Sequence, residues 1–429
     1  MQLTKGQFFI IVGAFLVVAL LVLVFLGVIP GLSSAGRVSG KLTVWGAFDD
    51  SQDFEPALAA YKAARPGVEV EYVKQNAATY KSDLLNALAA KNPPDVFMIQ
   101  NTWVPQFADK IIPLPFSALK RSTILDIFPP VTTADFVRDD GTYALPLYID
   151  TLALYYNQEL FDQRGIALPP RTWADLEKLI PALRQLDSGG RVVRAAAAIG
   201  GSLKSINRAP DLLSLLMLQS GTEMTAQGNR ANFASSEGLQ ALNFYTQFAQ
   251  AQTPYFTWQD SFKNSIDAFA DESAAMMFNY SYQAELLRDK NPFLKFRIVQ
   301  MLQPQKATRD VNFANYWGFT VGSRSAAPSL AWDFVQFLTT SPEASKLYLD
   351  AAHHPPALRS LINTYINDSD LGVFARQALT ARSWIEGDAD AVDRVFSDMI
   401  EAVLAGRTPK NALEEAQTKT TAVLQKVIQ

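Results

Sequence analysis

Apolar residues in the first quarter of the chain switch between two periodicities. Leu42–Trp45 is a short apolar run typical of a buried strand, and residues 54–61 carry apolar side chains at helical spacing. Residues 68–72 then alternate valine and tyrosine with glutamate, as a half-buried strand does. A second helical pattern at 80–88 precedes the apolar run Asp95–Ile99. The spacing predicts strand–helix–strand units of the βαβ kind.

The same alternation continues to the C-terminus. Thr172 and Asp175 form a capping-box pair that opens a helix, which Pro181 should kink or divide. Further strands are expected at 274–278, 296–302 and 319–321, and further helices at 330–338 and after the N-cap and proline pairs Ser341-Pro342 and Thr408-Pro409. Strands alternating with helices predict an α/β fold with largely parallel sheets.

The stretch Asp140–Asn157, DGTYALPLYIDTLALYYN, does not follow either period. Leu145, Leu147 and Ile149 share one face, but the other face is nearly as apolar, and Asp150 lies in the middle. A run that is apolar on both faces predicts a strand buried on both sides. Pro146 should place that strand at a sheet edge, at a strand end or at a bulge.

The N-terminus predicts a membrane segment. Phe8–Ile29 is uncharged over twenty-two residues and follows Lys5. A spanning helix needs ~20 residues, whereas the apolar part of a cleaved signal has ~7–15. We therefore expect residues 1–30 to be a retained anchor with Lys5 on the cytoplasmic side, followed by a flexible tether at 31–40. A cleaved signal is the alternative, because Ser33-Ser34-Ala35 offers small residues. In both cases the rest of the chain is extracytoplasmic.

Composition narrows the function. The 429 residues carry a net charge of -4 with no basic run, which argues against nucleic acid as a partner. Without cysteine, thiol catalysis and thiolate metal sites are excluded. The two histidines, His353 and His354, are adjacent before two prolines, a pattern typical of a rigid loop. Motifs of metalloproteases, nucleotide-binding loops and serine hydrolases are missing. Catalysis by paired carboxylates stays open, but a non-enzyme without cofactor or metal is favoured.

Aromatic side chains gather near the predicted strand ends. Trp103 follows the strand at 95–99. Tyr280 and Tyr282 follow the strand at 274–278, and Trp317 precedes the strand at 319–321. In open α/β sheets, ligands bind beyond the carboxyl ends of the strands. Aromatic rings that face apolar sugar surfaces, together with polar groups for the hydroxyls, indicate a site that binds a saccharide without catalysing a reaction. The alternative for each ring is ordinary burial in the core.

Several segments in order resemble one family. They include KLTVWGAF, RPGVEVEYV, PPDVFMI, ADKIIPL, DGTYALPLYIDTLALYYNQELFDQRGIALPPRTWADL, FADESAAMMFNYSY, AWDFVQFLTTSPEASK and GRTPKNALEEAQTK. From about Lys41 to Gln429 the chain resembles the extracellular solute-binding proteins of ABC importers, in particular the carbohydrate-binding family that includes maltose-binding protein.

The resemblance implies a two-lobed, periplasmic-binding-protein-like α/β fold with hinge crossovers. In this chain the expected transmembrane helix precedes that fold. The chain is expected to cross near Tyr148–Leu154, return near Leu302–Pro304 and cross again near Leu358–Ile366. The lobes then comprise 41–149 with 304–360, and 150–303 with 361–429.

The resemblance also implies a monomeric substrate-binding protein that captures a sugar or oligosaccharide by hinge closure and delivers it to a permease. The alternatives are a membrane-tethered sensor or scaffold and, third, an exported glycoside hydrolase. Tyr282 stands where the family usually has tryptophan. The expected ligand-binding residues are Phe48, Asp49, Asp50, Asn101, Trp103, Tyr148, Asp150, Asn207, Tyr280, Tyr282, Tyr316, Trp317 and Trp384.

Overall fold

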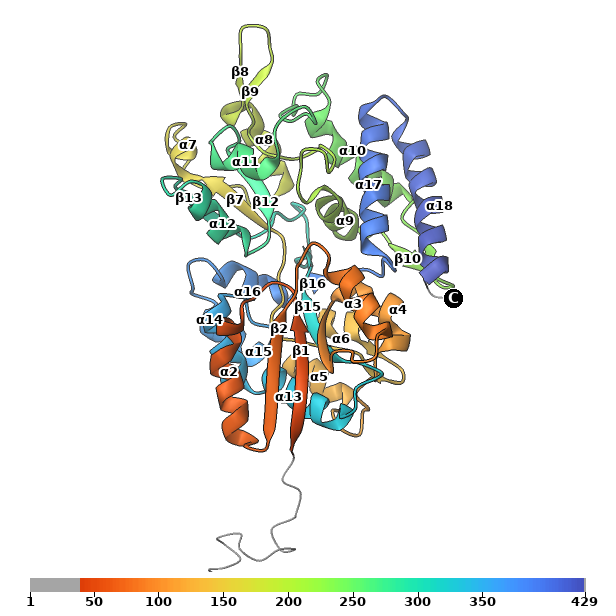
Figure 1. Cartoon of the computed structure of the whole chain (residues 1–429). Coiled ribbons are helices and arrows are strands. Elements are labelled where there is room, and N and C mark those ends of the chain that lie inside the picture. The colour runs from red at the N-terminus through yellow and green to blue at the C-terminus, as the bar shows by residue number, and fades with distance from the viewer. Residues whose placement is uncertain (1–38, 428–429) are drawn as a thin grey trace, which may run out of the picture.

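Two sheets, each with its own buried core, make up residues 39–427, the part of the chain described by the computed structural model (Figure 1). The sheet of lobe 1 has the strand order β2-β1-β3-β15-β6. These strands are β1 (Gly40–Gly46), β2 (Val68–Lys74), β3 (Val96–Gln100), β6 (Leu145–Pro146) and β15 (Trp317–Val321). β1 runs parallel to β2 and β3, as the βαβ pattern predicts, whereas β15 is antiparallel to β3 and β6.

Helices pack around this sheet through their apolar stripes. In α2 (Ser51–Ala64) the buried side chains Phe54, Ala57 and Tyr61 recur at helical spacing. The other elements of lobe 1 are α3 (Tyr80–Ala89), α4 (Val104–Phe107), α5 (Arg121–Ile127), α6 (Pro130–Phe136), α13 (Pro328–Thr340), α14 (Pro342–Ala352), α15 (Arg359–Tyr365), α16 (Gly372–Ala378), the 3₁₀ turns η1 (Asn101–Trp103) and η2 (Ala108–Lys110), and the hairpin of β4 (Val137–Arg138) and β5 (Gly141–Thr142).

The sheet of lobe 2 has three strands in the order β12-β7-β13, and both pairs are antiparallel. They are β7 (Ala153–Asn157), β12 (Met276–Asn279) and β13 (Phe296–Val299). The expectation of largely parallel sheets is wrong for this lobe. The chain enters the lobe through β7 and turns back toward the hinge through β13, so these two strands run in opposite directions.

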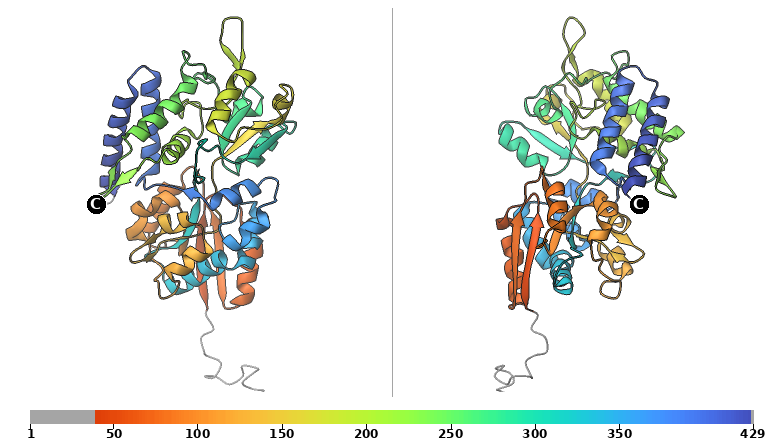
Figure 2. Two further views of the ribbon diagram at one scale, coloured as in Figure 1. Left: turned by 180° about the vertical axis from the view of Figure 1, so that it is seen from behind. Right: turned by 45° about the vertical axis from the view of Figure 1, so that its right-hand side comes forward.

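The remaining elements surround the sheet of lobe 2. The hairpin of β8 and β9 projects from the top, and α17 and α18 pack together along one side (Figures 1 and 2). The elements are α7 (Gln158–Asp162), α8 (Trp173–Leu183), β8 (Gln185–Leu186), β9 (Val192–Arg194), α9 (Ala209–Gln219), β10 (Thr225–Ala226), β11 (Arg230–Ala231), α10 (Ser236–Thr246), η3 (Gln247–Ala249), α11 (Ser265–Ala270), α12 (Gln283–Lys290), α17 (Ala389–Leu404) and α18 (Pro409–Val427).

The predicted helix starts are confirmed by their capping contacts. The backbone N–H of Asp175 donates to Thr172 Oγ1 at 3.1 Å, and the N–H of Thr172 donates to the Asp175 carboxylate at 3.2 Å. Ser341 accepts from the N–H of Ala344 at 3.3 Å. Pro181 does not divide α8, which continues to Leu183. The proline lies in the last turn of the helix, where little helix remains to be broken.

Buried residues divide between the two cores at three places. Ile149 belongs to the core of lobe 1 and Leu152 to the core of lobe 2. The chain returns between Phe313 and Ala314, about ten residues after the predicted return. Ala381 is the last residue of the lobe 1 core. The third crossing therefore follows α16, later than the expected crossing near Leu358–Ile366. Most buried apolar residues of α15 and α16 pack in lobe 1, although Phe374 packs in the core of lobe 2.

The three crossings lie side by side and form the hinge. Thr151 forms a bridge with Ala314, and β14 (Asn312–Phe313) pairs with β16 (Ala381–Arg382). Short backbone pairs join segments that are distant in sequence, so the hinge is tied without a large core of its own. Pro146 lies in β6 at the edge of the lobe 1 sheet, which confirms the edge placement.

The predicted anchor Phe8–Ile29 lies outside the described residues. Within residues 39–427, none of the helices is long and apolar enough to cross a membrane. The described chain begins at the end of lobe 1 that faces away from lobe 2 (Figure 1).

Candidate functional site

Three predicted aromatic residues form one cluster on the lobe 1 side. Trp317, at the start of β15, contacts Phe48 with ring centroids 5.0 Å apart and Trp103 with centroids 4.8 Å apart, both edge to face. Phe48 is 42% exposed and Trp317 is half-buried, so this cluster has an accessible aromatic surface. The indole Nε1 of Trp103 is buried and has no hydrogen-bond partner in the described structure.

A buried polar network lies beside this aromatic cluster. Asp135, at the end of α6, accepts hydrogen bonds from Asn101 Nδ2 at 3.0 Å and from the Tyr316 hydroxyl at 2.8 Å. Ser383 also donates to Asp135 and so joins the third crossing to lobe 1. Burial raises the pKa of Asp135 to about 6, although these three donors act to lower it. Asn101 and Tyr316 are buried and hold Asp135 instead of presenting a surface.

The lobe 2 side carries a tyrosine and arginine cluster at the end of β12. Tyr280 and Tyr282 stack with centroids 6.3 Å apart, and the guanidinium of Arg208 lies 5.2 Å from the Tyr280 ring. Arg208 Nη2 donates to the Tyr282 hydroxyl at 2.5 Å, and the Tyr280 hydroxyl donates to Asp211 at 2.7 Å. Tyr282 is 40% exposed, so it gives this side an accessible ring.

Asp150 ties the hinge together. Its carboxylate accepts from the backbone N–H and the hydroxyl of Ser281 at 2.9 and 2.7 Å, and from the N–H of Thr151 at 2.8 Å. Burial raises the pKa of Asp150 to about 6 against these donors. Asp150 is among the expected ligand-binding residues, but its acceptor oxygens are occupied by the protein itself, and ligand binding there stays a prediction.

Asp49 and Tyr148 belong to a second buried group below the hinge. Asp49 accepts from the Tyr348 hydroxyl at 2.7 Å and contacts His354 Nε2 at 2.8 Å, and the His354 ring stacks on Tyr148 at 4.3 Å. Burial alone acts to raise the pKa of Asp49 and to lower that of His354. Their mutual attraction outweighs burial, lowering the pKa of Asp49 and raising that of His354.

The remaining predicted residues are dispersed. Asp50 is exposed and pairs with Lys74 at 2.8 Å. Asn207 is half-buried beside the tyrosine cluster, where its Oδ1 accepts from Asn279 Nδ2 at 3.4 Å. Trp384 is buried in the core of lobe 2, where its ring packs on Phe396. The structure therefore brings Phe48, Trp317, Tyr282 and Asn207 to the two surfaces on either side of the hinge, with Trp103 and Tyr280 buried against Trp317 and Tyr282. Binding at these residues stays a prediction.

Several charged residues at these surfaces were missed by sequence reasoning. Arg208 follows the predicted Asn207 directly, and Glu386 lies two residues after Trp384. Neither residue stood in a recognisable motif. Only the fold brings Asp135, Asp211 and Asp393 to the same region.

Two ion pairs join the lobes at separate places. Lys81, at the start of α3, contacts Asp388 at 3.1 Å and Asp390 at 3.2 Å, and its ammonium lies 5.2 Å from the Trp103 ring. Arg288 in α12 contacts Asp370 at 2.8 Å. Among the described residues there is no group of acidic and histidine side chains that could hold a metal ion.

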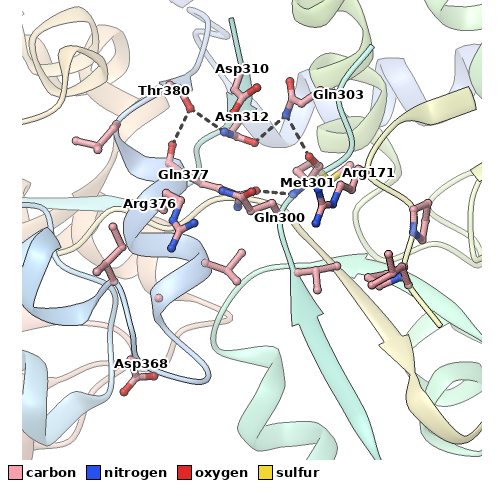
Figure 3. Close-up of a pocket in the computed structure, with 18 residues that line it drawn as sticks. Arg171, Gln300, Met301, Gln303, Asp310, Asn312, Asp368, Arg376, Gln377 and Thr380 are labelled. Atoms are coloured by element: carbon pink, nitrogen blue, oxygen red, sulfur yellow. Dashed lines mark hydrogen bonds between the residues drawn. The ribbon is translucent and has the colours of Figure 1, made fainter. Parts of the chain in front are cut away.

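A cavity of about 850 Å³ also lies between segments of the two lobes (Figure 3). Gln377 Nε2 donates to Thr151 Oγ1 at 2.8 Å, and Gln377 Oε1 accepts from the Met301 N–H at 2.6 Å. Asn312 Nδ2 donates to Thr380 Oγ1 at 2.8 Å, and Gln303 contacts Asn312 at 3.3 Å. We call this cavity the rear cavity. None of the predicted site residues lines it. Its amide side chains bond the crossings to one another.

Two lobes on a three-segment hinge, with accessible aromatic rings on both sides, define a hinged ligand-binding protein. The chain belongs to the family of bacterial extracellular solute-binding proteins, which it matches over residues 57–370. The description of this family places its members outside the cytoplasm.

Similar proteins extend over most of the chain. A binding protein of Brucella abortus is 21% identical over 383 residues, which are 87% of this chain and 90% of that protein. The maltotriose-binding protein of Pyrococcus abyssi is 22% identical over 345 residues, 78% of this chain and 69% of that protein. The structure of the cyclic α-maltosyl-1,6-maltose binding protein from Arthrobacter globiformis aligns with a TM-score of 0.76 at 20% identity, over 90% of this chain and all of that one.

Proposed function

We propose that this chain is the substrate-binding protein of an ABC importer and captures a sugar or oligosaccharide between its lobes. One observation carries the proposal: accessible aromatic rings from both lobes, Trp317 and Tyr282, lie on opposite sides of a hinge. Such rings cover the apolar faces of sugars, and hinge closure buries the ligand without reaction. The family and the relatives named for maltotriose and for cyclic maltosyl-maltose support this reading over a hydrolase.

Ligand binding would act by shifting the balance between an open and a closed form. The aromatic surfaces belong to different lobes, so both contact one ligand fully only when the lobes are close. A permease would then distinguish the closed form from the open one. The interlobe ion pairs at Lys81 and Arg288 would contribute little to this preference, because partly exposed pairs are weak.

Isothermal titration of the full chain in detergent against mono- and oligosaccharides tests the proposal. We expect at least one saccharide to bind, and small-angle scattering to show a smaller radius of gyration on binding. Failure of every sugar to bind would contradict the proposed function.

The tether is a separate part of the proposal. The uncharged stretch Phe8–Ile29 would hold the binding protein at the outer face of the membrane. Fractionation of expressing cells tests this point: a retained anchor leaves full-length protein in the membrane fraction, whereas a shortened, soluble product shows that the segment is cleaved.

A further inference from the structure

Glu386 is a buried carboxylate without a partner. It is 6% exposed, and among residues 39–427 its carboxylate makes no hydrogen bond or ion pair. A tight turn holds it in place: the N–H of Asp388 donates to the carbonyl of Glu386 at 2.9 Å, and Gly387 between them has a φ of 73°. Glycine adopts this left-handed conformation without strain.

The charges that act most strongly on Glu386 have the same sign as its own. They come from Asp393 and Asp390 on α17, from Asp211 on α9 and from Asp135 on α6 of the opposite lobe. The chain just before Glu386 is held against both of these helices, because Ser383 donates to Asp135 on α6 and Trp384 Nε1 donates to Ser214 Oγ on α9 at 3.3 Å. We call these residues with Glu386 the acidic group.

Few cations compensate the acidic group. Arg208 lies 3.9 Å from Asp211 but is also engaged by the Tyr282 hydroxyl, and its Nε has no partner in the described structure. Arg394 on α17 is exposed and acts on Asp393, and Lys81 reaches Asp390 from lobe 1 at 3.2 Å. Carboxylates therefore outnumber the cations in direct contact with them.

The acidic group lies at the surfaces that carry the aromatic rings. Asp211 accepts from Tyr280 on the lobe 2 side, and Asp135 is held by Tyr316 directly before Trp317 on the lobe 1 side. Trp103 adds a buried donor at the lobe 1 surface, because its 5% exposed indole has an N–H without an acceptor among the described residues. A native structure leaves few buried polar groups unpaired, and each such group needs an explanation.

We propose that the saccharide bound in this cleft carries an ammonium group, as an amino sugar does, and that Glu386 with Asp393 receives it. The inference rests on the proposed function and narrows its ligand class. A buried carboxylate without a partner is costly, and a cation brought by the ligand removes that cost. The aromatic rings cover the apolar faces of the sugar, while the Trp103 N–H donates to one of its oxygens.

The protonation of the acidic group predicts how the affinity for an amino sugar changes with pH. Burial raises the pKa of Asp393 to about 8 and that of Asp135 to about 6, and it raises the pKa of Glu386 and Asp211, the latter against the charge of Arg208. A bound ammonium group favours the ionised carboxylates and so releases protons. Affinity for an amino sugar should therefore rise with pH between about 5 and 7. A neutral sugar that only accepts hydrogen bonds from protonated carboxyls gives the opposite trend.

Titration calorimetry with the full chain in detergent tests the inference, using matched pairs of ligands at about pH 6.5, where the amines are charged. The pairs are glucosamine with glucose, galactosamine with galactose, and the glucosamine disaccharide chitobiose with cellobiose. We expect one amino sugar to bind roughly tenfold to a hundredfold more tightly than its neutral counterpart, the gain of a charge-assisted hydrogen bond. Titrations in two buffers of different ionisation enthalpy should show proton release with the amino sugar.

Glu386→Gln supplies the matched variant, since it removes the charge and keeps the shape. It should abolish most of the preference for the amino sugar over its neutral counterpart. Asp398→Asn, at an exposed position on α17, the helix that follows Glu386, is the control and should leave the preference unchanged. If neutral sugars bind and the amines bring no gain, the inference is wrong and the proposed function stands. If no sugar of either kind binds, both are wrong.

Discussion

The rear cavity and the two aromatic surfaces beside the hinge use their polar side chains in opposite ways. In the rear cavity, Gln377 and Asn312 use their amides to bond one crossing to another (Figure 3). At the aromatic surfaces, the carboxylate-bearing Glu386 is 6% exposed, and the buried Trp103 N–H has no acceptor among the described residues. Buried polar groups that bond one another stabilise the fold. Buried polar groups without hydrogen-bond partners destabilise it, and a ligand that bonds them can remove that destabilisation.

The largest expected effect is on the rear network. Gln377→Leu removes the hydrogen bonds to Met301, Thr151 and the Leu152 carbonyl, and leaves buried groups without partners. We expect the free energy of unfolding to fall by about 2–4 kcal/mol, as measured by urea denaturation. Gln300→Leu is the control, because Gln300 lines the same cavity but is exposed. Equal losses in the two variants would mean that the network does not brace the hinge.

A substitution at the aromatic surface should lower the affinity for sugar, whereas the substitution in the rear network lowers stability. Trp317→Ala removes a half-buried ring that contacts Phe48 and Trp103, so we expect sugar affinity to fall about ten- to hundredfold. Calorimetry on the folded variant measures this loss. Phe293→Ala, at a residue that is 89% exposed, should leave affinity unchanged. A Trp317 variant with unaltered affinity would remove this surface from the binding site.

The acidic group should make the ligand-free protein less stable as pH rises. Asp393 and Asp135 have pKa values raised to about 8 and about 6, so the folded protein binds more protons than the unfolded chain above about pH 4. Stability then falls by about 1.4 kcal/mol per pH unit for each extra proton held. The raised pKa of His354 acts in the same direction above about pH 6.5.

The variant Asp393→Asn separates the contribution of Asp393 to the pH dependence of stability from those of Asp135 and His354. It should flatten the decline in unfolding free energy between about pH 6 and 8, measured by denaturation at several pH values. Asp398→Asn on the exposed part of the same helix should not. An unchanged slope in the Asp393 variant would show that its carboxyl is ionised in the folded protein at neutral pH.

The smallest effect is expected at the edge of the cleft. Lys81→Met removes the contacts to Asp388 and Asp390, whose side chains are 30% and 63% exposed. Partly exposed pairs contribute about 1 kcal/mol or less, so affinity should change by less than about fivefold. The difference from the unmodified protein should shrink at high salt. A larger, salt-insensitive loss would indicate that Lys81 contacts the ligand itself.

The sequence predicted elements better than it predicted which core they join. Helices and strands followed from apolar spacing, whereas the first crossing near Asp150 was implied by the resemblance to the solute-binding family. The third crossing was expected near Leu358–Ile366 but follows α16, because an amphipathic helix shows that it has a partner but not which one. The direction of β7, β12 and β13 depends on where the chain crosses, and no local pattern encodes that.

The candidate site was predictable where it consists of aromatic residues next to strands. Trp103, Trp317, Tyr280 and Tyr282 follow that rule. Asp150 and Tyr316 also lie next to strands, yet their polar groups are used within the protein. Glu386 had no motif, since its significance comes from carboxylates that are distant in sequence.

A crystal structure of the full chain with a bound amino sugar tests the central claim most directly. The account predicts a sugar ring between Trp317 and Tyr282, with its nitrogen within hydrogen-bond distance of the Glu386 carboxylate and one oxygen at the Trp103 N–H. A ligand in the rear cavity, or a sugar in the cleft with its nitrogen directed away from Glu386, would contradict it.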